Sequence, residues 1–187
     1  MKLLIQDLFT PYPRLDTNRL ILRQVEESDI DDIHAYASDP MLTTHLTWDA
    51  HRTLQDTHAF IQFAFKQYEE NGVGPWAIVW KEKNQVIGTI DLVWNKKHYS
   101  AELAYAISRE FWRQGLGTEA VKKIINFGFK EMELERIQAR CVPDNIASYR
   151  LMETVGMTYE GTLRKSMFRK GKQEDIKMYS ILRNEYV

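Results

Sequence analysis

Short runs in which apolar and polar residues alternate recur along this chain, and such a period of two is typical of half-buried β-strands. In the first run, Leu20, Leu22 and Val25 lie between polar residues, so residues 19–25 are predicted to form a strand. The same pattern, with polar turns between the runs, predicts further strands over 76–81, 86–94, 101–107, 136–142, 157–168 and 173–182.

Helix signals mark four other segments, at 28–38, 53–70, 118–131 and 145–155. Ser28 is the predicted N-cap of the first, with Asp31 as its capping-box partner, and Asp39-Pro40 is predicted to end that helix. Gly156 is well placed as the C′ residue of the last. Strands and helices mix without strict alternation, which favours an α+β sheet with helices on both faces over a doubly wound fold.

A length of 187 residues makes one domain the default. Residues 1–16 include Pro11 and Pro13 and are predicted to form an extended arm, which leaves 17–187 as a single domain. The net charge of −1 gives no basic field, so direct nucleic-acid binding has no electrostatic support. Cys141, the only cysteine, lies in an apolar run, which favours a buried inert thiol over a nucleophile.

The N-terminal apolar run is too short for a signal peptide, and no segment approaches the length of a membrane span. With a single cysteine, which excludes an internal disulfide, this predicts a cytoplasmic protein that does not bind membranes. The five histidines show no metal-ligand spacing, so no metal is expected.

Two glycines, Gly115 and Gly117, separate the strand 101–107 from the helix that follows. Glycines allow a tight turn, and the unpaired N–H groups of a first helical turn attract anions such as phosphate or pyrophosphate. The turn fits neither a Walker A loop nor a dinucleotide fingerprint, and a simple tight turn is the alternative. The second Gly-x-Gly, Gly72-Val73-Gly74, precedes a strand and is interpreted as a plain loop.

Three motifs in series are specific together, namely Phe111-Trp112-Arg113-Gln114-Gly115-Leu116-Gly117-Thr118-Glu119-Ala120, Asn145-Ile146-Ala147-Ser148 and Glu160-Gly161-Thr162-Leu163-Arg164. With them the chain resembles, from about Thr17 to Glu185, the GCN5-related N-acetyltransferase (GNAT) superfamily and its RimJ/RimL-like branch of ribosomal-protein acetyltransferases. The resemblance implies an acyl-CoA N-acyltransferase fold with a mixed, mostly antiparallel sheet. Its strands 101–107 and 136–142 would splay apart to admit the thioester arm of acetyl-CoA.

The resemblance also assigns residues to the coenzyme. Those implied to bind it are Ala106, Ile107, Arg113, Gln114, Gly115, Leu116, Gly117, Thr118, Asn145 and Arg150. A strand irregularity within 104–107 would supply a backbone N–H to the thioester oxygen. Arg150 would reach the adenosine 3′-phosphate. Trp112 occupies a position where the superfamily often has Gln or Arg, and Arg113 beside it is either a phosphate ligand or a solvated surface residue.

Two carboxylates fit the general base, Glu102 on the strand before the glycine turn and Glu160 in the third motif. The alternatives are that Glu102 pairs with a strand neighbour and that Glu160 anchors Arg164. Many superfamily members have a tyrosine as general acid where this chain has Met152. Ser148 matches the ribosomal branch instead and either hydrogen-bonds the departing sulfur or caps its helix.

The activity implied is acetyl transfer from acetyl-CoA to a primary amine. An α-amine has a pKa of about 7.7–8.0 and a lysine about 10.4, so a protein N-terminus is the first acceptor to consider, and the resemblance implies that of a ribosomal protein. The alternatives are a polyamine, an antibiotic or a small amine metabolite, with the acceptor loops at 39–74. The alternative from another functional class is a non-catalytic acyl-CoA-binding sensor or subunit. Both a monomer and a homodimer are compatible with the sequence.

Overall fold

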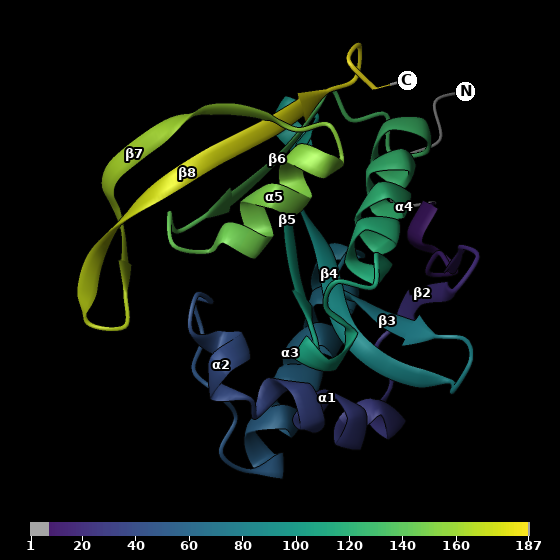
Figure 1. The fold of residues 1–187 in the computed structure, drawn as a ribbon. Helices are drawn as coiled ribbons and strands as arrows, with labels where there is room; N and C mark the ends of the chain where they lie inside the picture. The colour runs from purple at the N-terminus through teal and green to yellow at the C-terminus, as the bar shows by residue number, and fades with distance from the viewer. Residues whose placement is uncertain (1–7, 187) are drawn as a thin grey trace.

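A mixed sheet crosses the molecule in the strand order β1-β2-β3-β4-β5-β6-β8-β7 (Figure 1). The structure is a computed structural model, and it describes residues 8–186. The eight strands are β1 (Leu15–Asp16), β2 (Leu20–Gln24), β3 (Trp76–Trp80), β4 (Gln85–Asn95), β5 (Ser100–Ile107), β6 (Arg136–Cys141), β7 (Thr158–Arg169) and β8 (Lys172–Leu182). All neighbours in the described sheet are antiparallel except β5 and β6, which confirms the predicted fold class.

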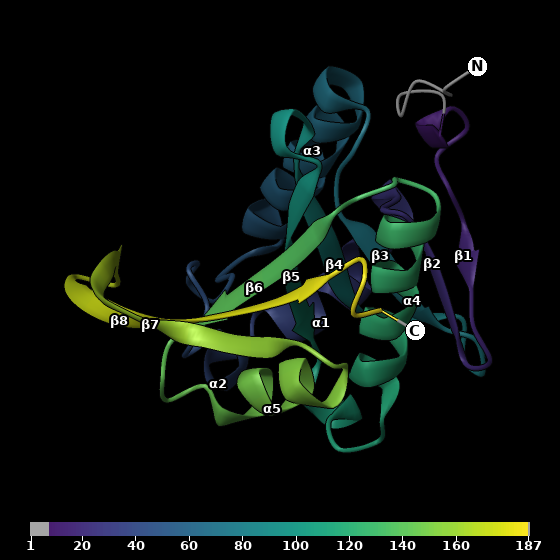
Figure 2. The ribbon, with the colours of Figure 1, turned by 90° about the horizontal axis from the view of Figure 1, so that it is seen from above.

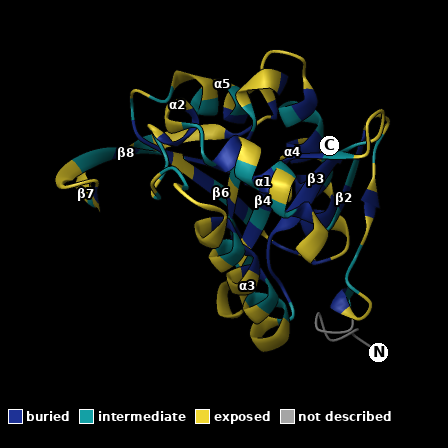
Figure 3. Cartoon of the chain, turned by 90° about the horizontal axis from the view of Figure 1, so that it is seen from below, coloured by how far each residue is buried: buried dark blue, intermediate teal, exposed yellow. Residues whose placement is uncertain are grey.

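Helices cover both faces of this sheet, as the view from above shows (Figure 2). They are α1 (Ile30–Ala37), α2 (Pro40–Thr43), α3 (Leu54–Asn71), α4 (Leu116–Lys130) and α5 (Ile146–Thr154). Buried residues gather on the central strands, whereas the outer side of α3 and much of β7 are exposed (Figure 3).

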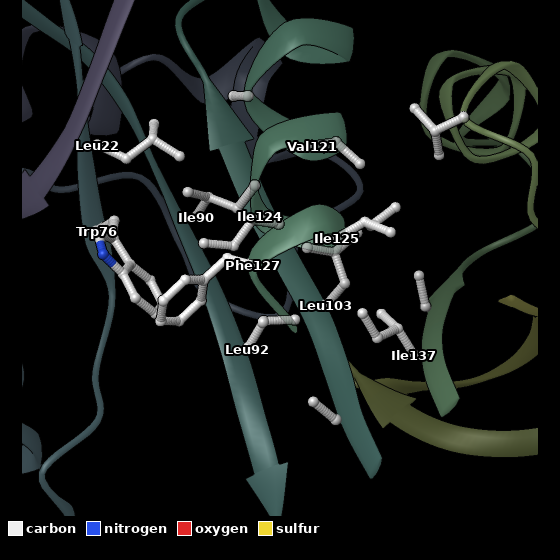
Figure 4. Close-up of a cluster of buried hydrophobic side chains, with 14 of the residues drawn as sticks. Leu22, Trp76, Ile90, Leu92, Leu103, Val121, Ile124, Ile125, Phe127 and Ile137 are labelled. Carbon is white, nitrogen blue, oxygen red and sulfur yellow. The ribbon is translucent and has the colours of Figure 1, made fainter. Parts of the chain in front are cut away.

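Alternation along β3 divides the core into two clusters. Trp76 packs with the α4 side chains Ile124 and Phe127 in the larger cluster (Figure 4). Ile78 belongs to the same cluster. Ala77 and Val79 face the other way and pack with residues of α1 and α3. Because both sides of β3 are covered, the strand reads as a continuous apolar run rather than an alternating one.

Helix boundaries agree with the sequence to within a few residues, but the start of the first helix does not. The predicted capping pair of Ser28 and Asp31 is wrong, because a 3₁₀ turn over Glu27–Asp29 precedes α1 and its capping box uses Glu26 and Asp29. Asp29 is held there by two hydrogen bonds from Arg23, 2.7 and 2.8 Å long. Asp39-Pro40 does end α1, and it also begins the short helix α2, which the sequence did not predict.

The described part of the predicted arm, residues 8–16, packs on the sheet. The Phe9 ring contacts Trp76 and Phe127, and the Tyr12 hydroxyl donates to the carbonyl of Gly74 at 2.6 Å. The first part of the arm, with its short apolar run, lies outside the described residues, so the boundary at residue 16 stays a prediction. Within residues 8–186, no helix combines the length and the hydropathy needed to cross a membrane.

The Gly72-Val73-Gly74 segment is more constrained than a plain loop. Gly72 has φ of +71° and forms the left-handed C-cap of α3. At Gly74 a Cβ atom would lie 2.7 Å from the ring of Tyr68, so the loop closes tightly on the helix it follows.

The parallel pair β5–β6 separates partway along its length. Residues 100–103 pair with 136–139, ending at Leu103 and Ala139, while β5 continues to Ile107 and β6 to Cys141. Beyond this point β6 is held by β8 and β5 by β4. The predicted splay between the two strands is therefore confirmed.

The irregularity predicted within 104–107 is not there, because β5 pairs with β4 in unbroken register. It lies on β4, where Val86 and Gly88 pair with consecutive residues of β3 and leave Ile87 as an extra residue. A Cβ atom on Gly88 would lie 2.2 Å from the carbonyl oxygen of Ala106. Only glycine therefore lets β4 approach the splayed end of β5 so closely.

We expect Gly88→Ala to destabilise the protein by at least about 2 kcal/mol, because the new methyl group meets backbone that no rotamer change can move. Gly128→Ala in α4 is the matched control, since its Cβ would meet only the side-chain ends of Ile137, Leu134 and Leu92. Urea denaturation of both variants measures the difference. An equal or smaller loss for Gly88→Ala would contradict the close-approach argument.

Candidate active site

A cavity of about 1140 Å³ opens where β5 and β6 separate. Its walls come from the glycine turn and α5 on one side of the sheet, and from α1, α3 and the loop after α2 on the other. The strand residues in between reach it from both faces. The splay thus joins two compartments that the sheet would otherwise separate.

Cross-strand pairing decides which strand residues face which compartment. Asp91 pairs with Ala104 and Thr89 with Ala106, and directly opposed residues point to the same face. Because Ile90 and Leu92 pack in the α4 core, Asp91 and Thr89 point to the α1 and α3 face. We call the part of the cavity on that face the acceptor side, and the part next to α4 and α5 the thiol side.

The glycine turn has the geometry of an anion site. Gly115 has φ of +77°, is the N-cap of α4, and has no side-chain cap. Gly115, Gly117, Thr118 and Arg113 all line the cavity, so the first-turn N–H groups of α4 are placed beside it. Arg113 itself has φ of +60°, an uncommon conformation for a residue with a side chain.

Gly117 has a packing role in addition to the predicted one. A Cβ atom there would lie 2.9 Å from Cδ1 of Ile107 and 3.1 Å from Cδ1 of Leu151. The glycine therefore lets the start of α4 approach both the end of β5 and α5. Trp112, where the superfamily pattern has a polar residue, donates its indole N–H to the carbonyl of Ile107 at 2.7 Å and ties the turn to the strand.

Three of the predicted coenzyme residues have side chains that do not line the cavity. Leu116 is buried in the core, and the amide of Gln114 donates to the carbonyl of Glu110, so only their backbone belongs to the turn. Arg150 is exposed and forms an ion pair with Glu153 at 3.0 Å. Its contact with the adenosine 3′-phosphate stays a prediction.

Two hydroxyl groups meet on the thiol side. The side chain of Asn145 caps α5 by accepting from the N–H of Ser148 at 3.2 Å, as expected for a helix N-cap. The hydroxyls of Ser148 and Tyr105 lie 3.0 Å apart. Burial raises the pKa of the Tyr105 phenol above its ordinary value, so both groups are neutral donors near pH 7.

Sequence reasoning missed Tyr105, which looked like one more residue of a buried strand. The Met152 side chain, at the position where the superfamily often has tyrosine, is buried and has no proton to give. Cys141 lines the cavity nearby, and burial raises the pKa of its thiol to about 11, which supports its interpretation as inert.

The two predicted base candidates have different surroundings. Glu102 lines the cavity on the acceptor side, where it forms an ion pair with Nε of Arg140 at 2.7 Å and accepts a hydrogen bond from Gln138 at 3.2 Å. It therefore does pair with strand neighbours, the alternative considered from the sequence.

Glu160 does not line the cavity, and its role as a base stays a prediction. It accepts two hydrogen bonds from Arg136, 2.6 and 2.5 Å long, and one from Ser180 at 2.7 Å. The Arg136 guanidinium lowers the pKa of Glu160 to about 2, which makes this carboxylate a poor proton acceptor. Its partner is Arg136, and not Arg164 of the same motif.

A carboxylate that the sequence did not single out, Asp91, lines the acceptor side. Burial raises its pKa to about 6, and no described side chain forms a hydrogen bond or an ion pair with it. The sequence feature that could have identified Asp91 is its position as the single acidic residue inside the apolar strand run 86–94.

The remaining acceptor-side walls are mostly aromatic and aliphatic. They include Tyr36, Leu42, Leu46, Trp48, Phe60 and Phe63. The histidines His45 and His51 also line this part. Burial lowers the pKa of His51, whose Nδ1 lies 2.9 Å from the Thr57 hydroxyl. Across residues 8–186, no three His, Cys, Asp or Glu side chains are grouped to hold a metal ion.

Comparison with known proteins gives a consistent result. Residues 19–158 match the acetyltransferase (GNAT) domain family. The chain is 34% identical over 173 residues to the N-acetyltransferase YoaA of Bacillus subtilis (strain 168), covering 92% of this chain and 98% of the relative. It superposes on a GNAT-family acetyltransferase from Bacillus anthracis with a TM-score of 0.83 and 27% identity, covering 92% and 99% of the two chains.

Two further solved structures share the fold and differ in their acceptors. One is the ribosomal-protein-S5-alanine acetyltransferase from Vibrio fischeri, with a TM-score of 0.75, 21% identity and coverage of 94% and 99%. The other is spermidine N-acetyltransferase from Vibrio cholerae in complex with CoA and spermine, with a TM-score of 0.78, 22% identity and coverage of 91% and 99%.

The match spans well over half of the chain, and the splayed strands with the uncapped glycine turn are the features that the sequence resemblance implied for acetyl-CoA. The chain belongs to the GNAT family and is an acetyl-CoA-dependent N-acetyltransferase.

Proposed function

We propose that this enzyme acetylates a primary amine attached to an apolar group, and that the acceptor is the N-terminal α-amine of a polypeptide. The observation that supports this proposal is the composition of the acceptor side. Its walls are aromatic and aliphatic, and only two carboxylates, Asp91 and Glu102, line the described cavity.

A polyamine is the less suitable acceptor for these walls. It has a cationic amine at each end, and burial of each cation needs its own free carboxylate. Glu102 is already paired with Arg140, which leaves Asp91 for a single amine. We therefore do not propose spermidine, the acceptor of one structural neighbour, as the acceptor of this chain.

The acidic run at 26–32, whose negative charge would attract cations, forms contacts within the protein. Asp29 binds Arg23, Asp32 accepts from the backbone N–H of Val86 at 2.8 Å, and Glu27 lies 3.0 Å from His58. These contacts stabilise the α1 region and leave little free negative charge to guide a polyamine.

The chemistry of the amine favours an α-amine over a lysine. At pH 7.5, about a third of α-amines with a pKa near 7.8 are neutral and nucleophilic, against about one lysine in a thousand. A polypeptide N-terminus also supplies an apolar first side chain for the aromatic walls. The cavity opens to solvent beyond them, so the rest of the chain has a way out.

Both ends of the reaction have suitable groups. Beyond Leu103, the edge of β5 that faces β6 has no strand partner. Backbone N–H groups of residues 104–107 that point into this gap are therefore available to the thioester oxygen. On the thiol side, Ser148, supported by Tyr105, can donate a hydrogen bond to the departing sulfur. The glycine turn binds the pyrophosphate of the coenzyme.

A panel of acceptors tests the proposal. We expect matched peptides that begin with Met or Phe to be acetylated at least about tenfold faster, as kcat/KM, than spermidine or an N-terminally blocked peptide with an internal lysine. The expectation rests on apolar burial of the first side chain, worth about 1.5–3 kcal/mol. Mass spectrometry locates the acetyl group, and thiol release measures the rate.

Variants of the wall make that panel specific. Trp48→Ala should reduce the rate with the Phe peptide, whereas Phe168→Ala, at an exposed position outside the cavity, serves as the control. Faster turnover of spermidine than of any peptide would overturn the peptide acceptor. Release of no free CoA with any amine would favour a non-catalytic acyl-CoA-binding protein.

We expect Ser148→Ala to slow acetyl transfer by roughly ten- to a hundredfold, because it removes a hydrogen bond to a developing thiolate worth about 1.5–3 kcal/mol. Tyr105→Phe should lower the rate less, since its hydroxyl acts through Ser148, and neither change should weaken acetyl-CoA binding measured by calorimetry. Acyl donors with a more acidic thiol should reduce the effect. Equal losses with all donors would show that Ser148 positions the coenzyme and does not act on the departing sulfur.

Glu160→Gln should leave kcat and its pH dependence unchanged and lower stability by about 1 kcal/mol, since the ion pair with Arg136 is partly exposed. The ion pair lowers the pKa of Glu160 from 4.5 to about 2, so its stabilisation is complete above pH 4.5 and lost as the pH falls towards 2. Urea titrations of wild type and variant at pH 7 and pH 3 measure this. A large fall in kcat would support Glu160 as the general base.

A further inference from the structure

Asp91 occupies a defined place relative to the splay. It lies in the middle of β4, directly opposite Ala104, the first residue of β5 beyond the last pair with β6. Both residues line the cavity. Because opposed residues share a face, the Asp91 carboxylate lies on the acceptor side, next to the strand segment along which the thioester must lie.

Small side chains leave space at this place. Ala104 and Ala106 are the two β5 residues that share the face of Asp91 beyond the splay. Each has only a methyl group, so β5 itself places no longer side chain between the carboxylate and the gap. The larger neighbours Leu103 and Tyr105 point to the opposite face, with the α4 and α5 core.

The carboxylate also lacks the partners that occupy the other acids near the site. Glu102 is paired with Arg140, and Asp39, where the acceptor loop begins, is paired with Arg109. Among the described residues, no hydrogen bond or ion pair links the side chain of Asp91 to another side chain. A half-buried carboxylate without a cation beside it is costly unless it has a use for its charge or its basicity.

On the basis of the proposed function, we infer that Asp91 is the group that accepts the proton of the acceptor amine, directly or through one water molecule. The amine nitrogen forms a bond to the thioester carbon, and the carbon–sulfur bond breaks with its electron pair on sulfur. One N–H proton passes to Asp91 and from there to solvent. The thiolate accepts a hydrogen bond from Ser148, which Tyr105 supports, and takes from solvent a proton that replaces the one Asp91 releases, so amine and thioester give amide and thiol with no net change in protons.

The surroundings of Asp91 suit this work. Burial raises its pKa to about 6, so it is ionised near pH 7 and yet more basic than an ordinary aspartate. The charged or titratable groups near it are few. Tyr12 and Tyr68 are neutral, with pKa values raised by burial, and Glu102 is compensated by Arg140. His45 and His51 line the same cavity.

The test compares Asp91→Asn with wild type over pH 5–9, using the best peptide of the acceptor panel. We expect kcat/KM to fall by about 10²-fold or more and the limb of the wild-type profile near pH 6 to disappear. Binding of acetyl-CoA by calorimetry should be unchanged. Asp31→Asn, at an exposed position on α1, is the matched control and should behave as wild type.

A second variant separates proton transfer from structure. Asp91→Ala leaves a space beside Ala104, and added formate should restore part of its rate without affecting Asp31→Asn. Asp91→Asn with a wild-type rate and an intact limb, or Asp91→Ala without formate rescue, would overturn the inference. Either result leaves acetylation of the peptide by wild type in place, whereas failure of wild type on every amine would refute the proposed function instead.

Discussion

The separation of β5 from β6 after Leu103 and Ala139 is the constraint on which this active site depends. Two parallel strands that part lose backbone hydrogen bonds, and the loss is tolerated only if other contacts hold each strand apart. β8 holds β6 along its length, and β4 holds β5. The close approach of Gly88 on β4 to Ala106 fixes the end of β5, where β4 is its only neighbouring strand in the described sheet. The gap is therefore a property of the whole sheet.

The period of two along a strand then separates the chemistry. On β5, Ala104 and Ala106 face the acceptor side, while Tyr105 faces Ser148 on the thiol side. A nucleophile and a leaving group need opposite proton transfers, and the sheet keeps their partners on opposite faces. One strand can serve both because each neighbouring residue points the other way.

The sequence predicted the parts of this arrangement that are local. Alternation located the strands, and the glycines with the following helix located the anion site at Gly115. The family resemblance supplied the splay. These features were predictable because each is encoded within a few adjacent residues.

The features that the sequence did not predict are contacts between residues far apart in the chain. Glu160 is neutralised by Arg136, 24 residues away, and no local pattern records that pairing. Asp91 and Tyr105 looked like interior strand residues, because their exposure to the cavity depends on where β6 stops pairing. Gly88 was passed over for the same reason, since its need for space arises from the neighbouring strand.

The acceptor wall is attached to the sheet by side chains more than by backbone pairing. Arg169, at the end of β7 and buried, donates to the carbonyl of Thr44 at 2.8 Å, and Lys170 donates to that of Thr43 at 2.7 Å. Arg109, just before the glycine turn, pairs with Asp39 at the other end of the same loop.

These hydrogen bonds and this ion pair hold residues 39–48 over the cavity, although the segment is not part of the sheet. Changes in this loop can therefore alter the acceptor walls while the splay and the glycine turn stay as they are. This separation gives a physical reason why one fold carries enzymes named for a ribosomal protein and for spermidine, and why the coenzyme side is easier to infer than the acceptor.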